Sequence, residues 1–151
     1  MKLSREQISY LRRTRVARLG TVDQKGRVQI VPIVFANTAN EIFFVVDRKA
    51  KKGKDLKRLK NIANNPMVTL LADCFSEDWS KLSHLIIYCK ARILDTGKEL
   101  PRKEKYARFL LEKYPQYSKG PYFPPRVNEA VFVELVPIRA VYWQNLRLSS
   151  A

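Results

Sequence analysis

The stretch Arg15–Phe35, RVARLGTVDQKGRVQIVPIVF, decides how this chain folds. Both of its halves are rich in β-branched residues, which favours strands over Val16–Val22 and Arg27–Phe35. Between them lies DQKG, a turn that places Gly26 where a positive φ costs least. The stretch therefore predicts an antiparallel hairpin. Pro32 in the second strand cannot donate to a sheet ladder, so it marks an edge, a bulge or a stretch that faces a ligand.

The same patterns extend the prediction outward in both directions. Upstream, Ser4–Arg13 is predicted to form a short helix with a capping box, because Ser4 can cap it and Gln7 follows three residues later. Downstream, a turn is expected at Asn37–Asn40, and strands are expected at Glu41–Asp47, Met67–Cys74, Leu82–Leu94, Ala130–Val136 and Arg139–Trp143. Helical spacing of apolar residues predicts two longer helices, one around Leu56–Ala63 that ends at Asn64-Asn65-Pro66, and one over Lys98–Tyr114.

These elements predict a fold that is mainly β with a few helices. The first three strands are joined by tight turns and predict an antiparallel meander. The complete order predicts an antiparallel barrel that is closed or partly closed. The Pro115–Pro125 loop is the one candidate linker and is too short to separate two domains. Residues 1–151 are therefore expected to form a single domain.

Composition argues against several classes of protein. Of the 151 residues, 46% are hydrophobic, which is typical of a folded domain that buries a core. No apolar run approaches the roughly 20 residues that cross a bilayer. The N-terminus lacks the apolar region of a signal peptide, so a cytoplasmic location is expected. The 5 glycines form neither a GxGxxG motif nor a P-loop.

Side chains that commonly carry catalysis are sparse. His84 is the single histidine, so no metal is expected, because a zinc site needs three or four clustered ligands. His84 is interpreted as a structural or surface residue. Cys74 and Cys89 form no CxxC pattern and are expected to be two buried thiols in strands, with a disulfide or redox pair as the alternative. No catalytic residue can be named, so the reactive group of an enzyme built on this chain would have to come from outside the protein chain.

Basic residues cluster where a predicted strand ends and a helix begins. Asp47–Lys60, DRKAKKGKDLKRLK, contributes strongly to a formal net charge of +15. The start of a helix offers free N–H groups and the positive end of its dipole, which favours a bound phosphate. The residues expected to contact a phosphate stand at the junction itself: Lys51, Lys52 and Lys54. The later cations are expected to form a solvated helix face: Lys57, Arg58 and Lys60.

Together these motifs resemble the pyridoxamine 5'-phosphate oxidase-related superfamily of FMN-binding split barrels. The similarity runs through the hairpin with its Val-Pro step, through EIFFVVDRKAKKGKDLKRLKNIANNPMVTLLAD at Glu41–Asp73, and to EDWSKL at Glu77–Leu82. Within this superfamily, the sequence resembles more closely the deazaflavin-dependent branch, which binds coenzyme F-420. The resemblance covers Ser4–Leu94 clearly and the final strands more loosely. It implies an antiparallel split β-barrel that binds its cofactor in the cleft of a homodimer.

The resemblance also implies which residues hold FMN or, alternatively, coenzyme F-420. The family grips the cofactor phosphate with an Arg/Lys pair in the pattern S-R-K-x-x-x-L, which here reads AKKGKDL from Ala50 to Leu56. The phosphate-binding residues are therefore Lys51 and Lys52, with Lys49 and Lys54 beside them. A lysine at position 51 loses the bidentate fork of arginine. The backbone of Val31, Pro32 and Ile33 is expected to lie against the isoalloxazine ring, and Trp79 to reach the partner subunit's cofactor or to pack in the interface.

The function that these features favour is a flavin- or deazaflavin-dependent oxidoreductase that transfers a hydride between its cofactor and a small molecule. The C-terminal region that holds the substrate phosphate in classical pyridoxamine phosphate oxidases is not recognisable, so that reaction is not expected. One alternative is a nucleic-acid-binding module, which the net charge motivates, although the aromatic residues are not interleaved with the basic run. Another is a non-catalytic cofactor- or haem-binding protein on the same fold. No membrane partner is expected.

Overall fold

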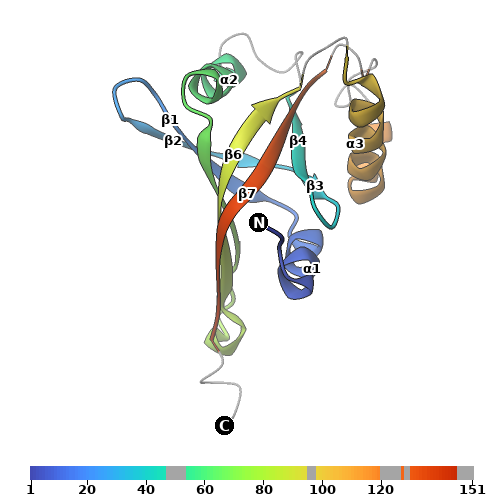
Figure 1. The fold of residues 1–151 in the computed structure, drawn as a ribbon. Coiled ribbons are helices and arrows are strands. Elements are labelled where there is room, and N and C mark those ends of the chain that lie inside the picture. Colours follow the sequence, from blue (N-terminus) through green and yellow to red (C-terminus); the bar gives the residue numbers. More distant parts are fainter. Residues whose placement is uncertain (47–53, 95–97, 120–126, 128–129, 146–151) are drawn as a thin grey trace.

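The computed structural model describes residues 1–46, 54–94, 98–119, 127 and 130–145, and of residues 54–56 only the backbone. In this part of the chain, one curled antiparallel sheet carries the helices around it (Figure 1). Its strands are β1 (Ala17–Val22), β2 (Val28–Ile33), β3 (Ala36–Asn37), β4 (Ile42–Val46), β5 (Met67–Cys74), β6 (Ser83–Ile93) and β7 (Val131–Gln144). The helices are α1 (Arg5–Arg13), α2 (Lys54–Asn64) and α3 (Leu100–Lys113), with 3-10 turns η1 (Trp79–Lys81) and η2 (Pro115–Ser118).

The strand order confirms the mainly β, split-barrel class. The strands follow one another as β2-β1-β5-β6-β7-β4-β3, and every pair is antiparallel. The first hairpin is confirmed: β1 pairs with β2 up to Val22 and Val28, and Gly26 in the turn has a φ of 76°. Pro32 lies on β2, an edge strand of this sheet, where a missing backbone N–H breaks no ladder.

The predicted three-stranded meander is wrong in its third strand. β4 does not pair with β2; it lies between β7 and the short strand β3. β3 occupies Ala36 and Asn37, so the turn expected from Asn37 begins one residue into a strand. Local turn signals predict which strands are consecutive in the chain, but the position of β4 depends on pairing with β7, which lies far along the chain.

The break predicted between the strands Ala130–Val136 and Arg139–Trp143 is also wrong, because the two form one strand. β7 runs unbroken from Val131 to Gln144 and pairs with β6 from Val133 to Gln144. The register shifts between Tyr88 and Cys89 of β6, opposite Pro137. This irregularity explains the error, because a proline normally argues against a central strand and is tolerated where a bulge interrupts the ladder.

The core fills the inside of the curled sheet. It contains fully buried residues from α1 and from the strands, such as Leu11, Leu19, Phe44, Ile87 and Leu135. A second buried cluster joins α3 to β4 and β7, with Tyr106 stacked on Phe43 at 3.8 Å between ring centroids and with Leu110 and Phe132 around them. None of the helices described is long and apolar enough to cross a membrane.

The two cysteines differ in environment, and both thiols are free. Cys89 is buried in β6, and burial raises the pKa of its thiol to about 12. Cys74 is the last residue of β5 and is exposed. The expectation of two buried thiols is therefore wrong for Cys74, because the strand ends there.

Candidate functional site

The three residues expected beside a flavin ring lie together on the edge strand β2, but their side chains point to opposite faces. Pro32 is exposed on the outer face, whereas Ile33 is buried and Val31 is half-buried on the core side. Of the strands described, only β1 pairs with β2, with Pro32 opposite Arg18. The outer backbone edge of β2 is therefore not used by another described strand. What this strand can offer a planar ligand is its backbone edge, as the family resemblance implies.

The basic junction lies between β4 and the start of α2. Lys49, Lys51 and Lys52 lie outside the described residues. Lys54 is the first residue of α2, and β4 ends at Val46, so the predicted sequence of strand, basic segment and helix is confirmed. The helix thus begins two residues after Lys52, and its first backbone N–H groups have no partner within the helix. Such an N-terminus favours an anionic group.

Two lysines further along α2 meet cations of the β1–β2 turn. Lys57 and Lys60 are exposed, as expected, and they line a hollow of about 440 Å³ with Lys25 and Arg27. The carboxylate in this hollow, Asp23, accepts hydrogen bonds from the backbone N–H and the Nε of Arg27, and these bonds lower its pKa. No local sequence pattern predicts this convergence, because the turn and the helix are far apart in the chain.

Arg58 does not belong to that exposed face. It is half-buried, and its guanidinium carbon lies 5.8 Å from the centroid of the Phe44 ring. The cation therefore packs on an aromatic face of the core, which contributes about 0.5–2 kcal/mol in such contacts. The prediction of a fully solvated run is wrong at this position because one side of α2 packs against the sheet.

Trp79 lies far from helix α2 within this chain. It is the first residue of η1, at the end of β5 opposite to α2, and the long strands β5, β6 and β7 carry it away from the rest of the sheet (Figure 1). Its side chain is 62% exposed. Its backbone oxygen accepts a hydrogen bond from Asn145 Nδ2 at 3.0 Å, which ties η1 to the residue after β7. We call the projecting ends of β5, β6 and β7, together with η1, the arm. The hydrogen bond fixes the end of the arm, while the indole ring of Trp79 stays exposed and can contact a partner.

The outer face of the sheet is apolar next to the edge strand. Val28 and Ile30 of β2 are 65% and 68% exposed. They border a hollow of about 440 Å³ whose walls come from β1, β2, β5 and β6, including Val22, Leu71 and Tyr88. Most isolated proteins avoid contiguous exposed apolar surface, so this face is a candidate for contact with another surface.

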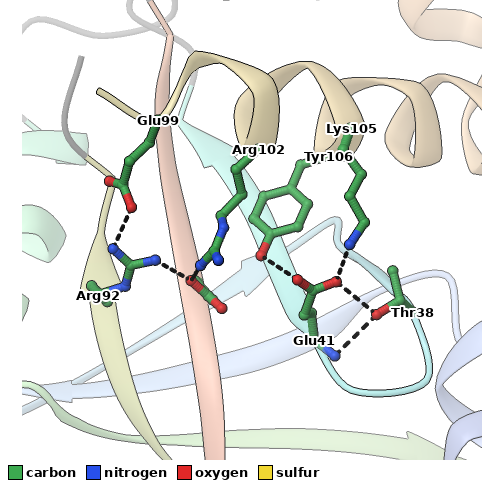
Figure 2. Close-up of polar contacts among 8 residues, drawn as sticks. Thr38, Glu41, Arg92, Glu99, Arg102, Lys105 and Tyr106 are labelled. Carbon is green, nitrogen blue, oxygen red and sulfur yellow. Dashed lines mark hydrogen bonds and ion pairs between the residues drawn. The ribbon is translucent and has the colours of Figure 1, made fainter. Parts of the chain in front are cut away.

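A buried carboxylate joins α3 to the sheet, and the sequence did not indicate it (Figure 2). Glu134 of β7 is 8% exposed, and its Oε2 accepts from Arg92 Nη2 at 2.7 Å and from Arg102 Nη1 at 3.1 Å. Arg92 also donates to Glu99, and these carboxylates raise its pKa. Arg92 and Glu134 pair in the register of β6 and β7. Only that register brings them together, so no spacing in the sequence could have predicted the pair.

A second carboxylate, that of Glu41 just before β4, contacts the same helix (Figure 2). Its Oε2 accepts from Lys105 Nζ at 2.7 Å and from Thr38 Oγ1 at 2.9 Å, and its Oε1 accepts from the Tyr106 hydroxyl at 3.3 Å. Burial on its own would raise the pKa of Glu41, but these hydrogen bonds and the charge of Lys105 lower it. Burial and the two carboxylates raise the pKa of Tyr106. Each group is occupied in docking α3, so the cluster is structural.

The single histidine does not join any cluster of polar groups that could do chemistry. His84 of β6 stacks on Trp143 of β7, with 5.4 Å between ring centroids, and faces Asp73 of β5 in the register. Among the described residues, no group of three or more His, Cys, Asp or Glu side chains could hold a metal ion.

Comparison with solved structures shows the same fold in proteins of different stated roles. The heme storage protein HutZ of Vibrio cholerae is 16% identical with a TM-score of 0.68, and the alignment covers 95% of each chain. A FAD-binding protein of Mesorhizobium loti is 18% identical with a TM-score of 0.64, over 94% of this chain and 95% of that one. An F-420 reductase is 20% identical with a TM-score of 0.62, over 88% and 94%.

Comparison of sequences gives the family. No curated protein matches the sequence. The sequence does match the pyridoxamine 5'-phosphate oxidase family over residues 3–143, from the start of the chain to the end of the long β7 strand. The match includes the β1–β2 hairpin, the basic junction and the arm that carries Trp79. This protein therefore belongs to the pyridoxamine 5'-phosphate oxidase family.

Proposed function

We propose that this protein is an oxidoreductase that binds FMN or, alternatively, coenzyme F-420, and that exchanges a hydride with a small molecule. The observation that carries the proposal is an open strand edge at Pro32 together with a helix that begins at Lys54, shortly after the lysine pair to which the family resemblance assigns phosphate binding. Two proteins with this fold are named for a FAD cofactor and for F-420 reduction, which supports a flavin-type ligand.

The residues of this chain fit such a ligand in two respects. The outer edge of β2 is not paired with another described strand, so the proposal places the planar ring against the backbone of Val31, Pro32 and Ile33, and the N-terminus of α2 favours a phosphate. In the proposal, Lys51 and Lys52 hold the phosphate, and Lys49 and Lys54 add positive charge. A bound flavin or deazaflavin supplies the hydride chemistry, and the protein supplies orientation and electrostatics.

The proposed active unit is a homodimer. The exposed apolar face around Val28 and Ile30 is the surface that a second copy would cover. Trp79, at the end of the arm, is 62% exposed and would contact the partner subunit or its cofactor.

The test is a binding titration of dialysed protein with FMN, FAD and coenzyme F-420, followed by the fluorescence of the ring. Lys52→Ala should weaken binding of the preferred cofactor by about 1–2 kcal/mol, because one charge-assisted contact is lost. Lys57→Ala is the matched control: it removes an exposed lysine from the same basic run and should bind like the wild type. The proposal fails if none of the three cofactors binds, and the phosphate assignment fails if Lys52→Ala and Lys57→Ala bind equally.

One observation favours a second candidate, a nucleic-acid-binding module. Lys25, Arg27, Lys57 and Lys60 converge on one hollow, as a phosphate backbone requires. In a gel shift with single-stranded and duplex oligonucleotides, a Lys57→Glu, Lys60→Glu double variant should then lose binding, and the wild-type affinity should fall steeply with salt. Binding that is indifferent to both changes removes this candidate.

A further inference from the structure

A second concave site lies away from helix α2. A hollow of about 560 Å³ opens between the end of α1, the short strand β3 and the last turns of α3. Figure 1 shows α1 and α3 well separated from α2. The charged and polar residues in its walls are Arg12, Arg15, Asn37, Glu112 and Lys113, and Phe109 adds an apolar wall.

Two of the three cations in this hollow are held in fixed positions. Arg15 Nη1 donates to the backbone oxygen of Lys113 at 2.7 Å, and its guanidinium carbon lies 4.5 Å from the centroid of the Tyr114 ring. Lys113 Nζ donates to the backbone oxygen of Leu11 at 3.0 Å and lies 4.0 Å from the centroid of the Phe35 ring. Ordering long basic side chains is a large part of the cost of binding an anion. Here folding has already ordered Arg15 and Lys113, so anion binding does not have to order them.

The hollow is short of negative charge. Among the ion pairs found between described residues, none involves Arg12, Arg15 or Lys113, although Glu112 also lines the hollow. Burial, reinforced by the nearby charge of Arg15, lowers the pKa of Lys113 to about 8. A lowered lysine pKa means that the ammonium form lacks a compensating anion. An oxyanion between these cations would relieve that deficit.

Asn37 adds an unsatisfied hydrogen-bond acceptor to the same wall. It is 5% exposed, and its Nδ2 donates to the backbone oxygen of Thr38 at 3.1 Å. Its Oδ1 is buried and has no hydrogen-bond partner among the described residues. A buried acceptor without a donor is costly and needs an explanation. A hydroxyl group beside the anion of a ligand would supply the donor.

We propose that this hollow binds a small molecule through a phosphate or carboxylate group held by Arg12, Arg15 and Lys113. The assignment uses neither the edge of β2 nor the junction before α2, so it does not depend on the proposed cofactor. Arg12 and Arg15 are both exposed and Lys113 is half-buried. Arg15 and Lys113, which are held by hydrogen bonds and aromatic rings, form the fixed part of the site, and Arg12 completes it from α1. The mixture of guanidinium, ammonium and aromatic groups suits a compact oxyanion better than an extended polymer.

The test is a titration of the ¹⁵N-labelled full chain with sodium sulfate, and separately with sodium acetate, at an ionic strength kept constant with chloride. Sulfate stands for the phosphate group and acetate for the carboxylate, and the tighter anion identifies the source. Amide shifts at Arg15, Asn37 and Lys113 should saturate. Arg12→Ala should weaken binding roughly tenfold, as expected for a lost charge-assisted contact, whereas Arg108→Ala, an exposed arginine of α3, should not.

The pH dependence gives a second readout. Sulfate keeps its charge between pH 7 and 9, so a fall in its affinity over that range would report deprotonation of Lys113, and Lys113→Met should abolish the fall. The other groups around Lys113 are the guanidinium groups of Arg12 and Arg15, the Glu112 carboxylate, and the hydroxyl of Tyr114, whose pKa burial raises; β3 contributes only uncharged side chains. Shifts that do not saturate for either anion, or equal affinity in Arg12→Ala and Arg108→Ala, overturn the proposal.

Discussion

Tyr114 shows how one side chain can join three segments that are distant in sequence. It follows the last residue of α3 and is 3% exposed. Its hydroxyl lies 2.8 Å from the backbone oxygen of Arg15 and 3.0 Å from that of Phe35, and it accepts from the Phe35 N–H at 3.3 Å. It thus satisfies backbone groups where the chain leaves α1 and where it passes from β2 to β3. These groups have no strand partner there, so the hydroxyl replaces one.

Tyr114→Phe should therefore destabilise the fold. The change keeps the ring and removes the hydroxyl, which leaves buried backbone groups unsatisfied at a cost of about 1–3 kcal/mol. The measurement is the free energy of unfolding from urea titration followed by circular dichroism. Tyr88→Phe is the matched control, because Tyr88 is 39% exposed on the outer face and should change stability little. Equal stability of the two variants would show that water satisfies the groups around Tyr114.

At the scale of single residues, the sequence predicts the features that depend only on residues close together in the chain. The capping box is confirmed: Gln7 N–H donates to Ser4 Oγ at 3.1 Å, and Ser4 N–H donates to Gln7 Oε1 at 2.9 Å. The positive φ of Gly26 follows equally from a local turn. The hydroxyl contacts of Tyr114 and the cations around Lys113 could not be predicted, because each depends on packing between α1, β3 and α3. The predicted phosphate contacts of Lys49, Lys51, Lys52 and Lys54 stay predictions.

At the scale of elements, helix α3 is held to the sheet by polar as well as apolar contacts. Its apolar face buries Tyr106 and Leu110 against β4 and β7. Beside that face, Arg102 of the helix and Arg92 of β6 both donate to Glu134. The helix was predicted from its spacing of apolar residues, but the strands it covers were not, because β4 was expected beside β2. Pairing of β4 with β7 is what places Phe43 under Tyr106.

Glu134→Gln tests how much the polar contacts contribute. The amide keeps the shape of the carboxylate but removes its charge from between two guanidinium groups. Breaking a fully buried pair costs 3–5 kcal/mol, and the 44% exposure of both arginine side chains reduces the expected loss to about 1–3 kcal/mol. Urea denaturation measures it, and Glu104→Gln, an exposed position on α3, is the control. An unchanged midpoint for Glu134→Gln would mean that apolar contacts alone dock the helix.

At the scale of the whole molecule, charge and apolar surface are distributed unequally. The cations gather at the α2 end and around the hollow between α1 and α3, whereas the outer face of β2, β1, β5 and β6 is mostly apolar. Repulsion from a net charge of +15 opposes association over most of the surface. A second copy is therefore expected to dock where charge is sparse, which is the face that contains Val28 and Ile30.

Ile30→Lys should convert the proposed homodimer into a monomer. Ile30 is 68% exposed in the single chain, so a lysine there is compatible with folding, and circular dichroism should be unchanged. In a symmetric dimer the substitution places two new charges in the apolar interface, which must be desolvated without a partner. Sedimentation velocity at micromolar concentration should show a dimer for the wild type and for Ala39→Lys, which adds the same charge in an exposed turn, and a monomer for Ile30→Lys. A wild-type monomer would contradict the dimer itself, whereas a dimer of Ile30→Lys would place the interface on another face.

If the cofactor cleft requires both copies, Ile30→Lys should also lose cofactor affinity although every lysine of the basic junction is intact.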